Sequence, residues 1–346
     1  MYMNLRSFTY WCSVKAWLLS LVLTACTDTE DVSMPDGIAF GVSTDAEGRA
    51  ATLIGEETED AFRAQPFAVF GDWKDTEAGP TLEEVFDNVS VAYDGKAPAP
   101  SGWNYTPVQR WKTNGWYDFR AYWPATNPIE NTSNAQTLAL EYNMQTQNED
   151  LMVAYRGCLT RSNPVGLSFR HALAAVAVKF MTDNTTYTYW VKNVYFNNLY
   201  YTGTLPYNSK EATPDLTTTW QYAARSTENI RLREWTSDTG VQAEATADGY
   251  PEDFNLFLPQ SLQVGESEAK PSITFTIDVR SGDTTIDAPT ITVALPDTDG
   301  EGNAMWWQAG KKYTYVITIK PEAFDITVRT TEWDEVDVTV GDINFQ

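Results

Sequence analysis

The sequence predicts an all-β protein built from antiparallel sheets that stack face to face. Several segments alternate apolar and polar residues with a period of two, which is typical of a strand with one buried face. The apolar positions of these segments are Ile38, Phe40 and Val42; Phe119, Ala121 and Trp123; Val176, Val178 and Phe180; Ile273, Phe275, Ile277 and Val279; Ile291, Val293 and Leu295; Tyr313, Tyr315, Ile317 and Ile319; and Val336, Val338 and Val340. Glycine- and proline-containing turns separate them, as at residues 95–102 and 296–302. One-sided strands joined by such turns favour β-sandwich domains.

One segment, residues 81–89, carries a helical pattern. Its apolar positions on a shared helical face are Leu82, Val85, Phe86 and Val89. Thr81, with Glu84 three residues later, resembles a capping box. Alternation resumes at once through Val91 and Tyr93, so a strand also fits this segment.

The N-terminal residues have the layout of a signal peptide. Arg6 and Lys15 precede an apolar run at residues 16–23, which is too short to span a bilayer stably. The run ends in the sequence LTAC, which resembles the lipobox of bacterial lipoproteins and makes Cys26 the expected lipid attachment site. The acidic residues that follow directly resemble export tags for the outer face of the cell.

Charge and cysteine content limit the binding partners and the disulfides that are expected for this chain. Removing residues 1–25 from the 346-residue chain leaves 321 residues, with 22 basic and 47 acidic side chains and a net charge of −25. Binding of nucleic acid or anionic lipid headgroups needs basic patches, so neither is an expected partner. Cys158 becomes the single free thiol, so no internal disulfide is expected and stability must come from burial.

The mature length suggests two domains, with a boundary near residues 161–164. Residues 203–250, rich in Thr, Ser, Glu and Ala, are expected to form long loops or an insertion.

No catalytic residue, cofactor or metal site is expected. The chain has one histidine, His171, whereas a zinc site or nucleophilic centre usually needs further His or Cys residues. Asp297, Asp299 and Glu301 alternate as in a calcium loop, but Gln308 stands where that loop needs its glutamate, so a solvated hairpin is favoured.

A cluster of aromatic residues allows two interpretations. Its members are Trp103, Tyr105, Trp111, Trp116, Tyr117, Tyr122 and Trp123. Such rings either pack in a core or stack on the apolar faces of sugars.

An ordered set of motifs suggests a family. The motifs are residues 103–107 (WNYTP), 110–111 (RW), 117–124 (YDFRAYWP), 150–154 (DLMVA), 167–173 (LSFRHAL), 258–262 (LPQSL) and 307–315 (WQAGKKYTY), followed by Trp333. Together behind a lipobox they resemble the fimbrillin-like proteins, the type V pilins of anaerobic Gram-negative bacteria.

The resemblance implies two β-sandwich domains of transthyretin-like topology. It divides the chain into a lipoprotein signal peptide at residues 1–25, a lipidated propeptide with the first strand at 26–49, and sandwich domains at 50–164 and 165–346. It also implies a structural or adhesive fimbrial subunit without enzymatic activity.

The resemblance also implies assembly by strand exchange. A trypsin-like or arginine-specific protease removes the first strand, and another pilin subunit donates a strand to the opened sheet, as in β-augmentation. The matching displaced residues here are Ile38, Phe40 and Val42. The expected cut lies between Arg49 and Ala50, and Arg63 is the alternative position. A third possibility is that both are ordinary surface arginines and the chain is not cut.

The donor candidates are Val336, Val338 and Val340, which could instead complete the last sheet of their own chain. The expected partners are other pilin subunits in a head-to-tail polymer, the outer membrane through the lipid anchor, and a host or bacterial surface glycan or protein. The alternative is a permanently anchored surface lipoprotein that binds glycan through exposed aromatics.

Overall fold

The structure is all-β, as the sequence predicts. The computed structural model describes residues 37–44, 59–96, 102–147, 149–161, 164–208, 215–223, 225, 230–231, 240–245, 254–299, 301–320, 324–332 and 338–339. Among these residues the one helix is the six-residue α1 (Glu59–Ala64), and no helix has the length and apolarity needed to cross a membrane. The two-domain, transthyretin-like arrangement stays a prediction.

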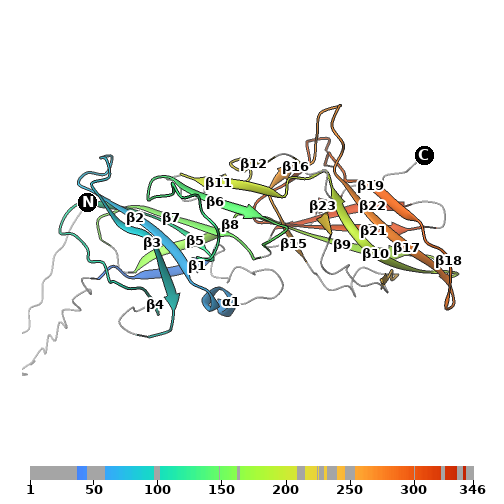
Figure 1. The fold of residues 1–346 in the computed structure, drawn as a ribbon, viewed down its shortest axis with the longest axis horizontal. Coiled ribbons are helices and arrows are strands. Elements are labelled where there is room, and N and C mark those ends of the chain that lie inside the picture. Colours follow the sequence, from blue (N-terminus) through green and yellow to red (C-terminus); the bar gives the residue numbers. More distant parts are fainter. Residues whose placement is uncertain are drawn as a thin grey trace, which may run out of the picture. The chain divides into compact units, whose positions relative to one another are not determined.

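The largest sheet has seven strands in the order β1-β8-β7-β5-β2-β3-β4 (Figure 1). The strands are β1 (Phe40–Thr44), β2 (Phe67–Lys74), β3 (Glu83–Tyr93), β4 (Trp103–Asn104), β5 (Trp116–Trp123), β7 (Met152–Leu159) and β8 (Val165–His171). All neighbours are antiparallel except β1 and β8, which run parallel. The first strand is therefore attached to one edge of an otherwise antiparallel sheet.

Four further sheets use the rest of the chain. A five-stranded sheet has the order β15 (Asn255–Phe257), β9 (Ala174–Thr182), β21 (Lys311–Ile319), β22 (Phe324–Glu332) and β23 (Val338–Thr339). A six-stranded sheet contains β10 (Thr188–Asn197), β13 (Ile230–Arg231), β14 (Val241–Gln242), β17 (Ser272–Ser281), β18 (Thr284–Asp287) and β19 (Thr290–Ala294). The small sheets are β12 (Gln221–Tyr222), β11 (Thr202–Tyr207) and β6 (Leu138–Asn143), and the pair β16 (Gln260–Ser261) and β20 (Trp306–Trp307).

The segment expected to be loop or insertion is partly strand. β11 begins just before residue 203 and pairs along its whole length with β6, so the two sides of the predicted boundary near residues 161–164 are joined by backbone hydrogen bonds. Short strands β12, β13 and β14 follow within the same segment. The sequence shows no sign of these strands, because strands of two residues are too short to show an apolar alternation.

Strands β2 and β5 of the seven-stranded sheet are buried on both faces, whereas β3 and β8 carry exposed residues. Along β2, Phe67 and Val69 pack into one apolar cluster, whereas Ala68 and Phe70 pack into another. We call the first cluster the aromatic core; it contains Ile38, Phe40, Phe62, Phe67, Val69, Phe86, Val91, Trp103, Tyr117, Phe119, Ala121, Trp123, Met152, Ala154, Val165, Leu167 and Phe169. The second cluster continues into strands β9, β10, β17 and β21. Successive side chains of a strand point to opposite faces, so a strand buried on both faces is apolar at nearly every position.

The helix expected at residues 81–89 is wrong, because this segment lies in β3. The pairing of β2 with β3 is irregular: Val69 lies opposite Val89, but Gly71 lies opposite Phe86. This bulge contains Asn88, whose φ of 49° is left-handed. An extra residue shifts the phase of the alternation, so the apolar positions acquire a spacing of three and four residues that imitates a helix.

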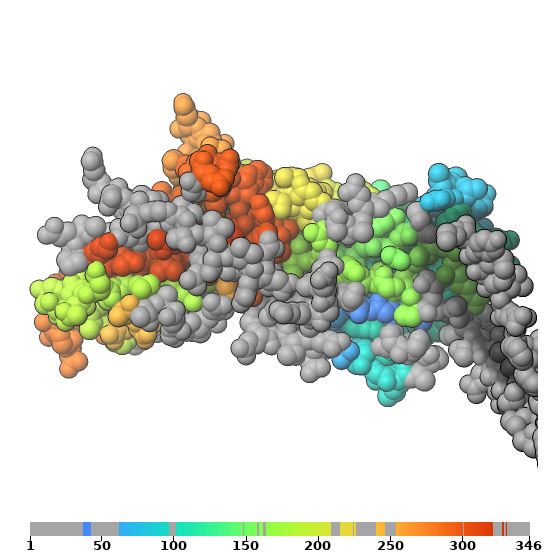
Figure 2. All heavy atoms as spheres, turned by 180° about the vertical axis from the view of Figure 1, so that it is seen from behind, coloured from blue at the N-terminus to red at the C-terminus, as the bar shows by residue number. Residues whose placement is uncertain are grey.

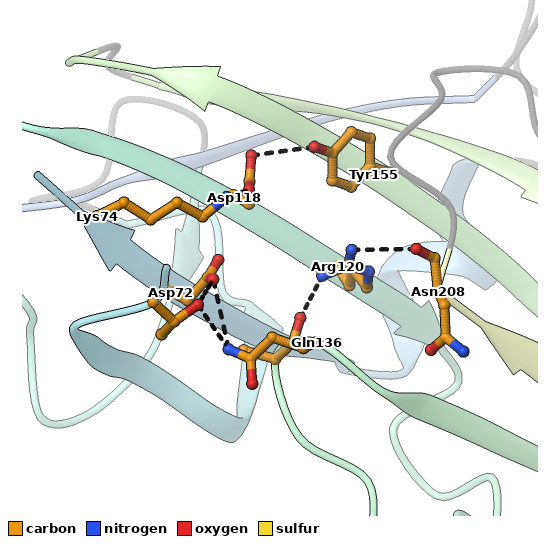
Figure 3. A network of polar contacts seen from close by, with 9 residues as sticks. Asp72, Lys74, Asp118, Arg120, Gln136, Tyr155 and Asn208 are labelled. Atoms are coloured by element: carbon orange, nitrogen blue, oxygen red, sulfur yellow. Dashed lines mark hydrogen bonds and ion pairs between the residues drawn. The ribbon is translucent and has the colours of Figure 1, made fainter. Parts of the chain in front are cut away.

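A polar network lies on the face of the seven-stranded sheet opposite the aromatic core. Figure 3 shows its side chains. Lys74 forms an ion pair with Asp118, whose other carboxylate oxygen accepts a hydrogen bond from the Tyr155 hydroxyl at 3.0 Å. The side chains of Lys74 and Asp118 are only 5% and 3% exposed. Nearby, Arg120 donates to the backbone carbonyl oxygens of Ala135 and Asn208. These contacts connect β2, β5 and β7 to the segments that cover the sheet.

The buried ion pair predicts a large stability effect. In Lys74→Met, Asp118 stays buried without its cation, which should lower the free energy of unfolding by about 3–5 kcal/mol in urea denaturation. The double variant Lys74→Met with Asp118→Leu should regain most of this loss, because it removes both charges of the pair.

Lys112→Met is the matched control, since Lys112 pairs with Glu83 where both side chains are substantially exposed. It should cost at most about 1 kcal/mol. Equal losses for Lys74→Met and Lys112→Met would contradict a structural role for the buried pair.

Candidate functional site

The candidate site is the edge of the seven-stranded sheet, where β1 lies. Among the strands of the described residues, β1 ends the strand order and pairs with β8 alone, from Phe40 opposite Val165 to Thr44 opposite Phe169. Figure 2 shows β1 as a blue patch on the surface, between green and teal segments. A strand with a single neighbour has roughly half the ladder hydrogen bonds of a central strand.

The side chain of Phe40 contrasts with this one-sided pairing. It is fully buried, and four aromatic rings surround it, three from the aromatic core and that of Tyr105, which packs against the core. The ring centroids of Phe67, Phe86, Tyr105 and Phe119 lie 6.1, 5.3, 5.7 and 5.7 Å from that of Phe40, three of them in T-shaped contacts. Edge-to-face contacts add to burial of the ring, and removing such a ring typically costs about 3–5 kcal/mol. The edge strand is therefore held mainly by its side chains.

Ile38 supplies the second point of attachment. Its amide donates to the Gln109 carbonyl oxygen at 2.8 Å, and its carbonyl oxygen accepts from the Tyr105 hydroxyl at 2.7 Å. Burial raises the pKa of Tyr105 to about 12, although the hydrogen bond from the Gln109 amide lowers it in part. The hydroxyl thus stays protonated at neutral pH and remains a donor to β1.

Loss of β1 would open a groove with two kinds of unsatisfied groups. The backbone of β8 from Val165 to Phe169 would lose its partner, including the Val165 amide that now donates to the Ala39 carbonyl oxygen at 2.7 Å. The sockets now filled by Ile38 and Phe40 would expose apolar surface. Both costs disappear if another strand with similar side chains enters the groove. The arrangement can bind a strand; it offers no reaction chemistry.

The structure places some predicted site residues in this site and leaves others untested. Ile38 and Phe40 lie in the aromatic core, and Val42 is half-buried against it. Cys26, Arg49 and Ala50 lie outside the described residues.

Arg63, the alternative cleavage position, lies in the last turn of α1. Its guanidinium carbon is 4.5 Å from the ring centroid of Tyr93, a cation–π contact. Proteolytic nicking concentrates in exposed loops and termini, so a helical, ring-packed arginine is a poor substrate.

The donor candidates are only partly described. Val338 lies in β23, where it is opposite Thr330 of β22 at the edge of the five-stranded sheet. Val336 and Val340 lie outside the described residues. Over its two described residues, Val338 and Thr339, this segment therefore completes the sheet of its own chain.

The aromatic cluster lies mostly inside the protein. Trp103, Tyr117, Tyr122 and Trp123 are all buried, and each belongs to one of the two apolar clusters. Trp103 at 4% exposure cannot offer its face to a sugar ring without unfolding of the core. The packing interpretation therefore holds for these four residues.

The remaining candidates for chemistry have structural surroundings. His171 Nδ1 lies 2.5 Å from Asp150 Oδ2, both buried where β8 ends. The Asp299 carboxylate accepts hydrogen bonds from the Asn303 side chain and from the amides of Asn303 and Glu301, and these bonds lower the pKa of Asp299. Within the described residues, no three His, Cys, Asp or Glu side chains gather as metal ligands would.

Sequence reasoning missed two groups that hold β1. Tyr105 and Gln109 contact Ile38 through a hydroxyl and a carbonyl oxygen. No periodicity marks such contacts, because they depend on how a loop folds over a distant strand. The one available signal was the position of Tyr105 inside the WNYTP motif.

Comparisons with known proteins agree with this fold. The chain is similar to a fimbrial protein from Bacteroides vulgatus ATCC 8482, with 17% identity over 86% of this chain and 99% of that one and a TM-score of 0.62. It is also similar to candidate cell adhesion proteins from Parabacteroides distasonis ATCC 8503 (12% identity, 87% and 97% covered, TM-score 0.52) and Bacteroides ovatus ATCC 8483 (15% identity, 87% and 98% covered, TM-score 0.50). At these identities the likeness shows a shared fold.

No protein with a curated description matches the sequence. The fimbrillin-like family model, in contrast, matches residues 50–333. This match covers most of the chain. It includes every strand from β2 to β22, whereas β1 and β23 lie outside it. The chain belongs to the fimbrillin-like family, a family of cell-surface fimbrial and adhesion proteins rather than of enzymes.

Proposed function

We propose that this protein is the lipoprotein precursor of a fimbrial subunit that polymerises by strand exchange at the β1 site. Cys26 carries the lipid, cleavage after Arg49 separates β1 from the rest of the chain, and a strand of another subunit replaces it. The observation that carries this proposal is the position of Phe40: a fully buried ring on an edge strand with one backbone neighbour. Such a strand fills a groove that another strand can occupy in the same way.

Two observations support cleavage at Arg49. The match to the family model begins at residue 50, which is the N-terminus that cleavage after Arg49 would create. The alternative, Arg63, has a helical backbone and a ring-packed side chain. Cleavage between β1 and α1 would leave every strand from β2 onward intact.

Cleavage would change the binding of β1 without changing its contacts. While the chain is continuous, β1 is tethered to its groove and rebinds at a high effective concentration. After the cut it is held by non-covalent contacts alone, so a competing strand can replace it. Donor and acceptor surfaces differ, so the contact is head-to-tail and can build an open filament.

The proposed partners are other pilin subunits, and the proposed location is the cell surface. The lipid on Cys26 would hold the precursor in the outer membrane and would leave with residues 26–49 on assembly. The net charge of −25 after signal removal argues against nucleic acid as a partner. None of the described residues identifies a ligand that the filament would bind, whether glycan or protein.

Limited trypsin treatment tests the cleavage site. The mature chain should lose an N-terminal fragment ending at Arg49, and the major product should begin at Ala50 in mass spectrometry. Arg49→Gln should abolish this product and filament formation. Arg63→Gln, the matched control, should change neither. A product that begins at Ala64 in the unaltered chain would instead assign the cut to Arg63.

Tyr105→Phe tests how β1 is held. It removes the hydroxyl that donates to the Ile38 carbonyl oxygen and keeps the ring that packs on Phe40. The hydroxyl also accepts from the Gln109 amide, but only its bond to Ile38 joins the fragment. Loss of that bond, about 1 kcal/mol, should speed release of the cleaved fragment about fivefold in size-exclusion chromatography.

Tyr93→Phe removes a hydroxyl from a ring that packs on Trp103 rather than on β1, and it should leave the release rate unchanged. Equal acceleration by both variants would mean a general weakening of the core.

Cys26→Ser tests the anchor. It should abolish metabolic labelling with palmitate and shift the protein out of the membrane fraction. Sheared filaments should contain subunits that begin at Ala50 and lack lipid. Filament subunits that retain a lipidated Cys26 would contradict the tether role and favour a permanently anchored protein.

A further inference from the structure

Lys74 and Asp118 form a buried ion pair that no step of strand exchange uses. Lys74 lies on β2 and Asp118 on β5, which are neighbours in the seven-stranded sheet. We propose that the Lys74 amine and the Asp118 carboxyl group condense into an amide, an intramolecular cross-link that joins the two strands. Such a bond would hold the sheet together in a chain for which no internal disulfide is expected. It is independent of the proposed function.

The condensation needs no reagent from outside the chain. One proton moves from Lys74 Nζ to Asp118 Oδ2, which converts the ion pair into an amine and a carboxylic acid. The lone pair of Nζ attacks Asp118 Cγ, and a C–N bond forms. The tetrahedral intermediate then loses the Oδ2 hydroxyl together with a proton from Nζ, as water. The products are an amide and one water molecule, and nothing is oxidised or reduced.

Burial favours this reaction over the stable ion pair that the same groups form in water. The side chains of Lys74 and Asp118 are 5% and 3% exposed, and proton transfer between them removes two charges at once from the interior. Reacting groups held together in one site can reach effective concentrations of about 10⁵ M or more. Lys192 and Asp278 also form an ion pair, but at 23% and 10% exposure water stabilises their charges better.

The surroundings of Asp118 are suited to stabilise the intermediate. The Tyr155 hydroxyl donates to Asp118 Oδ1 at 3.0 Å, and this oxygen carries the negative charge after attack. Figure 3 shows Lys74 and Tyr155 on either side of the Asp118 carboxylate. The Arg120 guanidinium carbon, 5.4 Å from the Tyr155 ring centroid, adds positive charge nearby. Gly157 makes room for the hydroxyl, because a Cβ atom there would meet both Tyr155 and Asp118.

Asp72 is the candidate acceptor for the proton that Nζ loses. It lies directly opposite Asp118 and two residues before Lys74, so all three side chains point to one face of the sheet. Asp72 is only 2% exposed. Its Oδ2 atom accepts from Thr81 and Gln136, whereas its Oδ1 atom has no hydrogen-bond partner among the described residues. This oxygen can therefore take the proton and return it to the leaving hydroxyl.

Peptide mapping tests whether the bond forms. The purified mature protein is denatured, digested with trypsin and measured by mass spectrometry. We expect residues 64–96 and 113–120 as one linked species, because trypsin does not cut after an acylated lysine. Its mass should be one water molecule below the sum of the two peptides. Trypsin should still cut after Lys192, whose ion pair is the internal control.

Three variants assign the roles. Lys74→Arg keeps the positive charge but lacks a nucleophilic amine, so it should give no linked species. Asp72→Asn keeps both reacting groups and should lower the yield of linked species at least about tenfold, because an amide does not accept the proton. Lys192→Arg, the matched control, should leave the yield unchanged.

Two outcomes would overturn the inference. The first is cleavage after Lys74 in the unaltered chain with no linked species. The second is a water loss confined to an unlinked peptide, as a succinimide at Asp94-Gly95 would produce. Full yield in Asp72→Asn would overturn the role of Asp72 as proton acceptor.

The double variant Lys74→Met with Asp118→Leu compensates for an ion pair but not for an amide. Its free energy of unfolding is therefore compared with that of Lys74→Arg, which keeps the two opposite charges and cannot condense. If the cross-link forms, the unaltered chain should be more stable than both variants in urea denaturation. Equal stability of the unaltered chain and Lys74→Arg would contradict a cross-link that holds the sheet.

Discussion

The structure of the candidate site depends on one constraint: Phe40 is anchored by four aromatic rings, yet the strand that carries it has one backbone neighbour. Side-chain burial and ladder hydrogen bonds usually stabilise the same strands, but here they are separated. The groove is complete without covalent attachment of β1, because its walls are formed by β2, β3, β5, β8 and the segment around Tyr105. The strand is therefore replaceable in principle, provided that its substitute has a large ring in the same place.

Two strands near this site, β2 and β5, are buried on both faces, with the aromatic core on one side and a second apolar cluster on the other. The Lys74–Asp118 pair and the bonds from Arg120 fix β2 and β5 to the segments that cover the second face.

Alternation predicted long strands such as β5, β9, β17 and β21, because a one-sided strand needs an apolar residue at every second position. It failed where that condition was broken. The bulge at Asn88 shifted the phase in β3 and produced a helical spacing. Lys74 and Asp118 gave no signal, since a charged residue in a strand is expected to face solvent. Their burial follows from the covering segments, whose position along the chain says nothing about where they pack.

Two properties could be predicted from the amino-acid sequence: the all-β class, and the common burial of Ile38 and Phe40. Both are local, because they depend on the identity and spacing of nearby residues. Three other properties follow from the tertiary fold: β1 is an edge strand among the described strands, it runs parallel to β8, and Tyr105 and Gln109 hold the segment before it. Those properties depend on contacts between residues far apart in the chain, which no local pattern encodes.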